Sequence, residues 1–404
     1  MKRLIKVGLD ILLFSIVPVI TWFVLGIIIG GNIISIFIVS YPIQFIVEML
    51  KSIFATGANI SQSKDGLKGS VMSGAVIGIV VGTIMWALML MNVDNYMHFM
   101  NVSGATYKLF LTYAIAQMFL QYVLRIVLMK LYYEGDNIRA NNYTVKFNAL
   151  NFFILISSIL LTNNYITAVI ITLVAMSIYT LFVCVKVFEK FKFNFNLTNA
   201  LKYDSLDLFS NFSMFVIYMV GVNNIMQYGK EYVVAITFVT LITDTQWDIS
   251  DAVTVVAKID ISQNKFILKK HIKNAYKLLS ILLMSTIIML LVLFRYYDLN
   301  LTIVLISLSV DVLGFVLYPI YIVKTCYLQI EYSPMKTTSN KVISNALRTG
   351  ASFLRTPYCT GIGQLISCIY QTITINAIFK KNYEIDKETG IIIKKRKIIG
   401  EEIG

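Results

Sequence analysis

Residues Glu231 to Ala257 read EYVVAITFVTLITDTQWDISDAVTVVA, a stretch long and apolar enough to cross a lipid bilayer that nevertheless carries three aspartates. Asp244, Asp248 and Asp251 stand at positions i, i+4 and i+7, so a helix presents all three carboxylates on one face. A charge at the centre of a bilayer costs roughly 2.5–3.5 kcal/mol. These side chains are therefore predicted to face protein or a water-filled cavity, which makes the stretch a candidate transport pathway.

The composition of the whole chain agrees with a membrane protein. Of the 404 residues, 57% are hydrophobic and only 14% are charged, whereas a soluble domain carries about 25% charged residues. The apolar residues arrive in blocks of about 20, the length at which a helix crosses a hydrocarbon core of ~30 Å. The chain is predicted to be an all-α polytopic membrane protein with about 12 transmembrane helices. We expect them near residues 5–29, 33–58, 69–93, 105–131, 147–163, 165–187, 206–227, 231–257, 272–294 and 299–323, with two short spans or a re-entrant pair within 341–379.

Lysine and arginine are concentrated in every second loop. One set of loops includes Lys64 and Lys190, whereas the alternate loops hold only Lys230 and Arg295. By the positive-inside rule we expect a multi-pass protein of the plasma membrane with both termini in the cytoplasm. The net charge of +13 is then topological, and it predicts membrane lipid rather than nucleic acid as the partner. A weaker alternative is binding of anionic lipid by the basic tail around 394–397.

A short motif recurs half a chain apart. Ile60-Ser-Gln-Ser-Lys64 and Ile261-Ser-Gln-Asn-Lys265 each follow an apolar span, at an offset of 201 residues. Duplication of a six-helix unit gives two lobes of the same orientation, related by a pseudo-two-fold axis along the membrane normal, as in many transporters. The predicted division is an N-terminal lobe (1–190), a cytoplasmic linker (191–205), a C-terminal lobe (206–380) and a basic cytoplasmic tail (381–404).

Further acids lie close to mid-depth in other spans. Glu48 falls in the second span and Asp311 in the tenth, and Glu48 and Asp248 stand 200 residues apart, as symmetry mates would. If all are ionised, the cavity between the lobes is strongly negative. Buried carboxylates can exchange H⁺ for Na⁺ or substrate, and a negative cleft concentrates cations.

The alternative for these acids is structural. Each could hydrogen-bond to backbone or pair with Arg125 or Arg348, which lie within spans. Two aromatic residues close to the acids, Trp247 and Tyr318, are candidates for contact with a flat substrate. No span contains a nucleophile–base pair, a metal cluster or a histidine, so neither an enzyme nor a cofactor or metal site is expected.

Four segments carry a resemblance to a known family. They are IIIGGNIISIFIVSYPIQFIVEMLKSIFATGANISQSKDG (Ile27 to Gly66), LYYEGDNIRANNYTVKFN (Leu131 to Asn148), Gly229 to Ala257, and SNALRTGASFLRTP (Ser344 to Pro357). With its repeat and its acids, the chain resembles the multidrug and toxic compound extrusion (MATE) transporters of the multidrug/oligosaccharidyl-lipid/polysaccharide flippase superfamily.

The resemblance implies two six-helix lobes around a V-shaped cavity and efflux of organic cations by Na⁺ or H⁺ antiport. It also implies that Asp311 matches a span 10 acid that couples transport in one branch of the family. The chain differs from the family at Thr21, where many members have an acid, and in its three span 8 acids.

Two functions remain open on the sequence. The first is a secondary active transporter, monomeric and acting by alternating access, that exports small amphipathic cations by using Asp311, Asp244, Asp248, Asp251 and Glu48. The second is a lipid or lipid-linked glycan flippase of the same architecture. A flippase is expected to line its cavity with lysine and arginine to hold phosphates, whereas the mid-depth charges here are mostly acidic.

Overall fold

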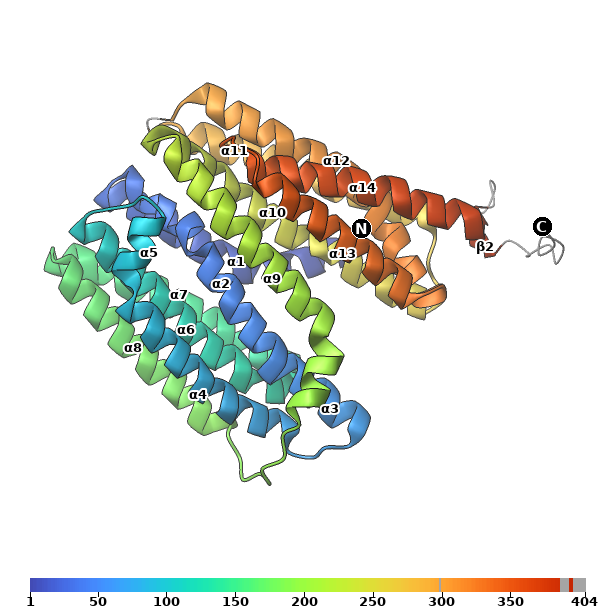
Figure 1. Cartoon of the computed structure of the whole chain (residues 1–404), viewed down its shortest axis with the longest axis horizontal. Helices are drawn as coiled ribbons and strands as arrows, with labels where there is room; N and C mark the ends of the chain where they lie inside the picture. The colour runs from blue at the N-terminus through green and yellow to red at the C-terminus, as the bar shows by residue number, and fades with distance from the viewer. Residues whose placement is uncertain (298, 386–391, 395–404) are drawn as a thin grey trace.

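The computed structural model describes residues 1–297, 299–385 and 392–394. The described chain is almost entirely helical (Figure 1). Its elements are α1 (Lys2–Ile29), η1 (Gly31–Ser35), α2 (Ile36–Lys51), η2 (Ser52–Gly57), α3 (Ala58–Asp65), α4 (Ser70–Met91), α5 (Val93–Phe99), α6 (Ala105–Tyr133), α7 (Asn137–Thr162), α8 (Tyr165–Val187), α9 (Leu197–Gln227), α10 (Lys230–Ser262), α11 (Leu268–Leu293), α12 (Leu301–Glu331), α13 (Pro334–Ser352), α14 (Cys359–Asn382), β1 (Tyr383–Ile385) and β2 (Ile392–Lys394).

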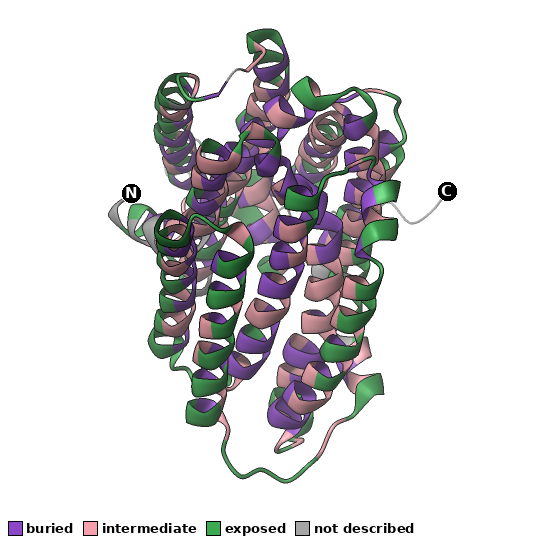
Figure 2. Ribbon diagram, turned by 90° about the vertical axis from the view of Figure 1, so that its left-hand side faces the viewer, coloured by how far each residue is buried: buried purple, intermediate pink, exposed green. Residues whose placement is uncertain are grey.

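The predicted spans coincide with these helices. Residues 341–379, at the C-terminal end of the predicted bundle, fall in α13 and α14. Within the described residues, nine helical stretches are long and apolar enough to cross a membrane, and Ile16–Ile29 of α1 is a shorter apolar helix. The outer faces of these helices stay exposed, as the green surfaces in Figure 2 show. Large apolar side chains such as Val80 and Leu88 on α4, Ile178 on α8 and Leu291 on α11 are at least half exposed, as expected of surfaces covered by lipid.

Some helix ends differ from the sequence expectation. The predicted linker 191–205 is helical from Leu197 onward, because the Asn196 side chain accepts a hydrogen bond from the Asn199 amide and caps α9. In the same way the Asp136 side chain accepts a hydrogen bond from the Arg139 amide and caps α7. This helix therefore begins at Asn137, ten residues before the expected start of that span. Only residues 188–196 between α8 and α9 lack regular structure. Of the predicted tail, residues 386–391 and 395–404 lie outside the described part, including Lys395 and Lys397.

In the predicted division α1–α8 form one lobe and α9–α14 the other, and most helices of the two groups lie on different sides of the molecule in Figure 1. The most extensive contacts between them join α1 to α10 and α9 to α2. In the predicted duplication α1 corresponds to α9 and α2 corresponds to α10. Each first helix therefore packs on the second helix of the other lobe, as a two-fold relation requires.

The two ends of the bundle are packed differently. One end, here called the basic end, holds Lys64, Lys190 and Lys336, and the other, called the opposite end, holds Gly30 and Gly229. At the opposite end a single apolar core joins both lobes, from Phe23 and Ile34 to Phe238 and Tyr297. At the basic end one large apolar cluster joins α10, α11, α12 and α14 with Leu4 of α1, whereas two further clusters lie within α2–α8 and the loop that follows. At this end the N-terminal part of α1 therefore packs on the C-terminal lobe, while α2–α8 keep their own clusters.

The lobes also meet at the basic end in a close contact between α9 and the π-helical turn η2. A Cβ atom added to Gly57 of η2 would lie 2.6 Å from the Ala200 carbonyl oxygen of α9, so the glycine permits this approach. The Asn211 amide donates to Ser52 Oγ at 3.2 Å. Beside them the Asp204 side chain is buried and its Oδ2 has no hydrogen-bond partner in the described structure.

Burial raises the pKa of the Asp204 carboxyl from 3.8 to about 6, since the ionised form loses its hydration. The folded protein therefore holds this proton more tightly than the unfolded chain. Its stabilising contribution is complete below pH 3.8 and is lost as the pH rises through about 6.

Asp204→Asn, which mimics the protonated acid, is accordingly expected to raise the melting temperature in detergent at about pH 8 and to flatten its pH dependence. The stabilisation is at most about 3 kcal/mol, the equivalent of a shift of about two pKa units. Glu189→Gln, at an acid in the loop between α8 and α9 whose side chain is 75% exposed, is the control and should change the melting temperature little. Equal effects of the two substitutions would contradict the assignment.

Candidate functional site

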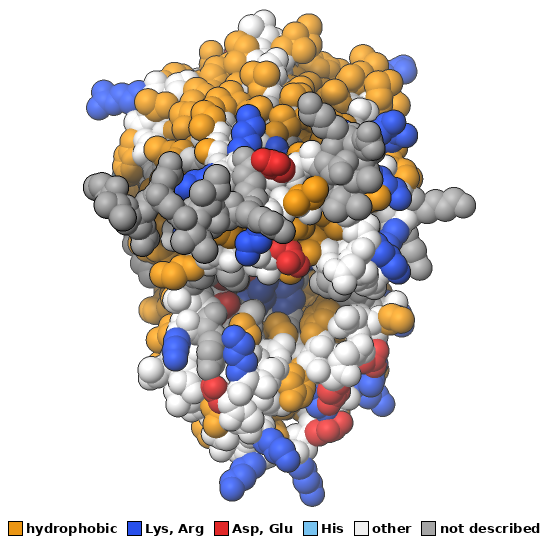
Figure 3. Space-filling view, turned by 90° about the vertical axis from the view of Figure 1, so that its right-hand side faces the viewer, with side chains coloured by type: hydrophobic (Ala, Val, Ile, Leu, Met, Phe, Trp, Pro, Cys, Tyr) orange, Lys and Arg blue, Asp and Glu red, His pale blue; other side chains and the backbone are white. Residues whose placement is uncertain are grey.

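A cavity of about 610 Å³ lies between the lobes and is lined by α1, α2, α6 and α7 on one side and by α9, α10, α12, α13 and α14 on the other. Viewed from the right-hand side of Figure 1, where α3 and the N-terminal end of α13 lie, the surface is hollowed between an upper and a lower body, with lysine or arginine side chains inside (Figure 3). The volume is in the range of sites that hold small molecules.

One wall of the cavity is acidic. Asp244 and Asp248 come from α10 and Asp311 comes from α12, so the structure brings together three of the predicted site residues. The Thr243 hydroxyl hydrogen-bonds to Asp311. On α14, a Cβ atom added to Gly361 would lie only 3.7 Å from Asp311 Oδ1, so the lack of a side chain there leaves this carboxylate uncovered.

Arg348 of α13 also lines the cavity, within electrostatic reach of both Asp244 and Asp311. Its guanidinium carbon lies 6.0 Å from the centre of the Tyr218 ring, a cation–π contact. Within the described residues, no ion pair within 4.0 Å joins Arg348 to a carboxylate. The acidic wall is therefore not locked by this arginine, contrary to the structural alternative.

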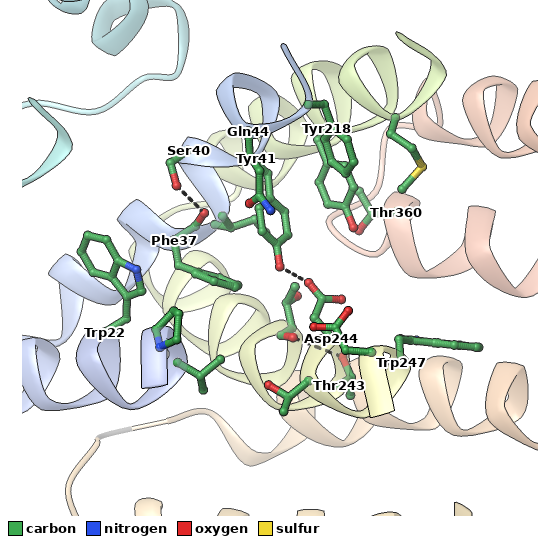
Figure 4. Close-up of a pocket in the computed structure, with 18 of the residues that line it drawn as sticks. Trp22, Phe37, Ser40, Tyr41, Gln44, Tyr218, Thr243, Asp244, Trp247 and Thr360 are labelled. Atoms are coloured by element: carbon green, nitrogen blue, oxygen red, sulfur yellow. Dashed lines mark hydrogen bonds between the residues drawn. The ribbon is translucent and has the colours of Figure 1, made fainter. Parts of the chain in front are cut away.

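A hydrogen bond crosses the cavity between the lobes. Tyr41 of α2 donates its hydroxyl to Asp244 of α10, and Figure 4 shows the two side chains pointing toward one another. The Tyr41 ring packs edge-on against Tyr218 at 4.8 Å, and Phe45 stacks on Tyr218 at 5.4 Å. Aromatic side chains of both lobes thus meet at the acidic wall.

Glu48, the fourth predicted acid, lies in a different environment. Its carboxylate accepts a hydrogen bond from the Arg125 guanidinium at 2.7 Å and forms a second ion pair with Lys51. Four carboxylates and three cations (Lys51, Arg125 and Arg348) line the cavity, which leaves one net negative charge among the described residues. The expectation of a strongly negative cavity is therefore wrong, because a neighbouring helix and the next helical turn supply counter-ions to Glu48.

Two predicted site residues are not among those that line the cavity. Asp251 is exposed and lies outside the cavity, because it follows the part of α10 that lines the cavity. Tyr318 is 5% exposed and packs against Trp247 and Tyr321, with its hydroxyl 3.4 Å from the Ser250 carbonyl oxygen. Trp247 does line the cavity, where its indole stacks on Phe315 at 4.2 Å.

The N-terminal lobe contributes a wall of amides that sequence reasoning missed. Tyr113 donates to Asn151 at 2.7 Å and Gln121 donates to Asn148 at 3.2 Å. Gln117 also lines this wall and is 9% exposed. The signal was present, because Gln117 and Gln121 are four residues apart and Asn148 and Asn151 are three apart, which places each pair on one helical face.

No protein-family model matches the sequence, and no curated protein matches it. Solved structures do match. An inward-facing structure of a multidrug resistance MATE family transporter aligns with a TM-score of 0.64 and 16% identity, over 94% of this chain and 95% of that one. The fold is that of the MATE transporters.

Two further structures extend this comparison. An outward-facing MATE family transporter aligns with a TM-score of 0.62 and 15% identity over 94% of this chain and 96% of that one. A transporter of the same superfamily from Pyrococcus furiosus, described as having a binding pocket of reverse polarity that suggests a different function, aligns with a TM-score of 0.56 and 15% identity over 93% and 95%. At this identity the MATE-type arrangement of two lobes is what the comparison establishes, and the resemblance of the sequence is confirmed at the level of fold.

Proposed function

We propose that the chain is a secondary active transporter, not an enzyme, that exports small amphipathic cations by antiport with Na⁺ or H⁺. The observation that carries the proposal is the acidic wall of Asp244, Asp248 and Asp311 in a cavity to which both lobes contribute. Carboxylates in a partly desolvated cleft attract cations and can exchange one cation for another. The MATE-type fold supports a transport role for that cavity.

The difference in packing between the two ends supports alternating access. The lobes share one apolar core at the opposite end, whereas at the basic end the clusters of α2–α8 are separate from the cluster that joins α10–α14 to the N-terminal part of α1. We infer that the basic end faces the cytoplasm of a cell whose plasma membrane holds the protein as a monomer with both termini inside. The structure then corresponds to a state open toward the cytoplasm, and rocking of the proposed lobes opens the other side.

Transport of a fluorescent cation by purified protein tests the proposal. In liposomes, rhodamine 123 is expected to accumulate when either a Na⁺ gradient or a pH gradient is imposed, and to leak out when the matching ionophore dissipates it. A tenfold ion gradient stores about 1.4 kcal/mol, so one-for-one exchange supports roughly tenfold accumulation. Absence of gradient-driven movement with either ion would overturn the assignment as an antiporter.

The flippase alternative retains one observation in its favour, the two basic side chains Lys51 and Arg125 on the cavity wall. The four carboxylates of the same cavity oppose it, because they repel a diphosphate. A competition experiment distinguishes the two functions. If undecaprenyl diphosphate displaces rhodamine 123 more strongly than unlabelled organic cations do, the flippase becomes the better supported function.

A further inference from the structure

Lys51 and Arg125 converge on one carboxylate in the cavity, that of Glu48. The three groups come from adjacent positions of α2 and from α6. They are only partly covered, with side-chain exposures of 27% for Lys51, 44% for Arg125 and 19% for Glu48. All three line the cavity, so a ligand in it can reach them.

Two cations around one carboxylate leave a positive charge on this part of the wall. Lys51 is also within electrostatic reach of Asp204, which is buried at the contact between α9 and η2 and is not among the residues that line the cavity. Arg125 uses its Nη1 to reach Glu48 Oε1. A guanidinium carries five N–H donors in a planar fork that suits a carboxylate, so Arg125 has donors to offer a second one.

The acid that Tyr41 contacts lies at a different depth from the group formed by Lys51, Arg125 and Glu48. Tyr41, whose hydroxyl meets Asp244, precedes Glu48 by seven residues on α2. At 1.5 Å per residue this is a separation of ~10 Å along the helix axis. The Asp244 carboxylate therefore lies about two helical turns further from the basic end than the two cations.

We propose that Lys51 and Arg125 form an anion subsite, with Glu48 as its internal counter-ion, and that the subsite binds the carboxylate of a zwitterionic substrate whose cationic end lies against Asp244 and Asp311. The inference rests on the proposed transport function and narrows its substrate class. A bound carboxylate brings the subsite to two cations and two anions, which balances the charge. A purely cationic ligand satisfies the acidic wall and leaves the subsite unused.

Two dyes that differ in one group test this directly. Rhodamine 110 carries a free carboxylate, and rhodamine 123 is its methyl ester, so both share the cationic ring system. Arg125→Gln is expected to reduce transport of rhodamine 110 at least tenfold relative to rhodamine 123, because it removes the guanidinium that pairs with the dye's carboxylate. Glu48→Gln removes the internal competitor and should shift the ratio the other way, several-fold in favour of rhodamine 110.

Lys108→Gln is the control variant, since Lys108 pairs with Asp94 and does not line the cavity. It should leave the ratio of the two dyes as in the unmodified protein. Rhodamine 123 transport by every variant reports on folding and on the proposed function itself. If rhodamine 123 moves normally and the ratio of the dyes does not change in Arg125→Gln or Glu48→Gln, the subsite is disproved while the transporter stands.

The remaining outcomes are also distinct. If neither dye moves in the unmodified protein, the proposed function fails before the subsite is reached. If undecaprenyl phosphate in the liposomes inhibits rhodamine 110 transport, and Arg125→Gln abolishes that inhibition without changing the dye ratio, the subsite binds a lipid phosphate, and the zwitterion proposal is overturned.

Discussion

Asp311→Asn is expected to reduce gradient-driven transport of rhodamine 123 roughly 30-fold or more, because losing the carboxylate that pairs with the cation in the cavity costs about 2–5 kcal/mol. Asp311 lines the cavity and faces Thr243 and Arg348. In the variant, no carboxylate of α12 balances the positive charge of Arg348. The wall then repels the cation that the wall of the unmodified protein attracts. The initial rate of dye uptake under an imposed ion gradient measures the effect.

Asp251→Asn is the matched control, since Asp251 belongs to the same group of predicted acids but is exposed outside the cavity. Its uptake rate should stay within about twofold of the unmodified protein, as is usual for a surface charge. Both variants should be obtained in similar folded amounts, because asparagine matches aspartate in size. Normal transport by Asp311→Asn, or equal losses in the two variants, would remove Asp311 from the mechanism.

Much of the fold could be predicted from the sequence because helices in a bilayer need uninterrupted apolar length. Even the two helices near the C-terminus, α13 and α14, fall where two short spans were expected from the need to return the basic tail to its side of the membrane. The length of an apolar stretch does not predict where its helix begins or ends outside the bilayer. There, side-chain caps at Asp136 and Asn196 extend α7 and α9 into regions read as loops.

The candidate site was predictable only in part, because helical spacing fixes a face but not what packs on it. Asp244 and Asp248 share both a face and the cavity, whereas Asp251 lies one turn further on the same face and outside it. The neutralisation of Glu48 depends on Arg125 of α6, a contact between residues 77 apart. Such contacts follow from how the helices pack, which spacing within one helix does not encode.

Gly26→Leu is expected to hold the opposite end apart and to reduce transport about tenfold. A Cβ atom at this position would lie 2.4 Å from the Tyr297 hydroxyl oxygen, where no such atom fits. Tyr297 is not free to move aside. Its hydroxyl donates to the Phe23 carbonyl oxygen at 2.6 Å, and its ring packs edge-on against Phe238 at 5.6 Å.

Gly26 and Phe23 belong to the N-terminal lobe, and Tyr297 and Phe238 belong to the C-terminal lobe, so the clash falls on the contact that closes this end. Overpacking of this kind costs about 1–3 kcal/mol. It acts on the closed arrangement alone, because the two surfaces separate when the lobes rock. Since about 1.4 kcal/mol changes an equilibrium tenfold, the population should move by roughly 5- to 150-fold toward the state open at the opposite end.

Chemical labelling measures that shift independently of transport. A cysteine introduced at Thr21, which lines the cavity and is 4% exposed, should react at least tenfold faster with a membrane-impermeant thiol reagent from the opposite end in the Gly26→Leu background. Adding Tyr297→Ala removes the obstructing ring and should restore both slow labelling and transport. If Gly26→Leu leaves labelling slow, or if Tyr297→Ala does not reverse its effect, then closure of this end does not depend on the contact between Gly26 and Tyr297.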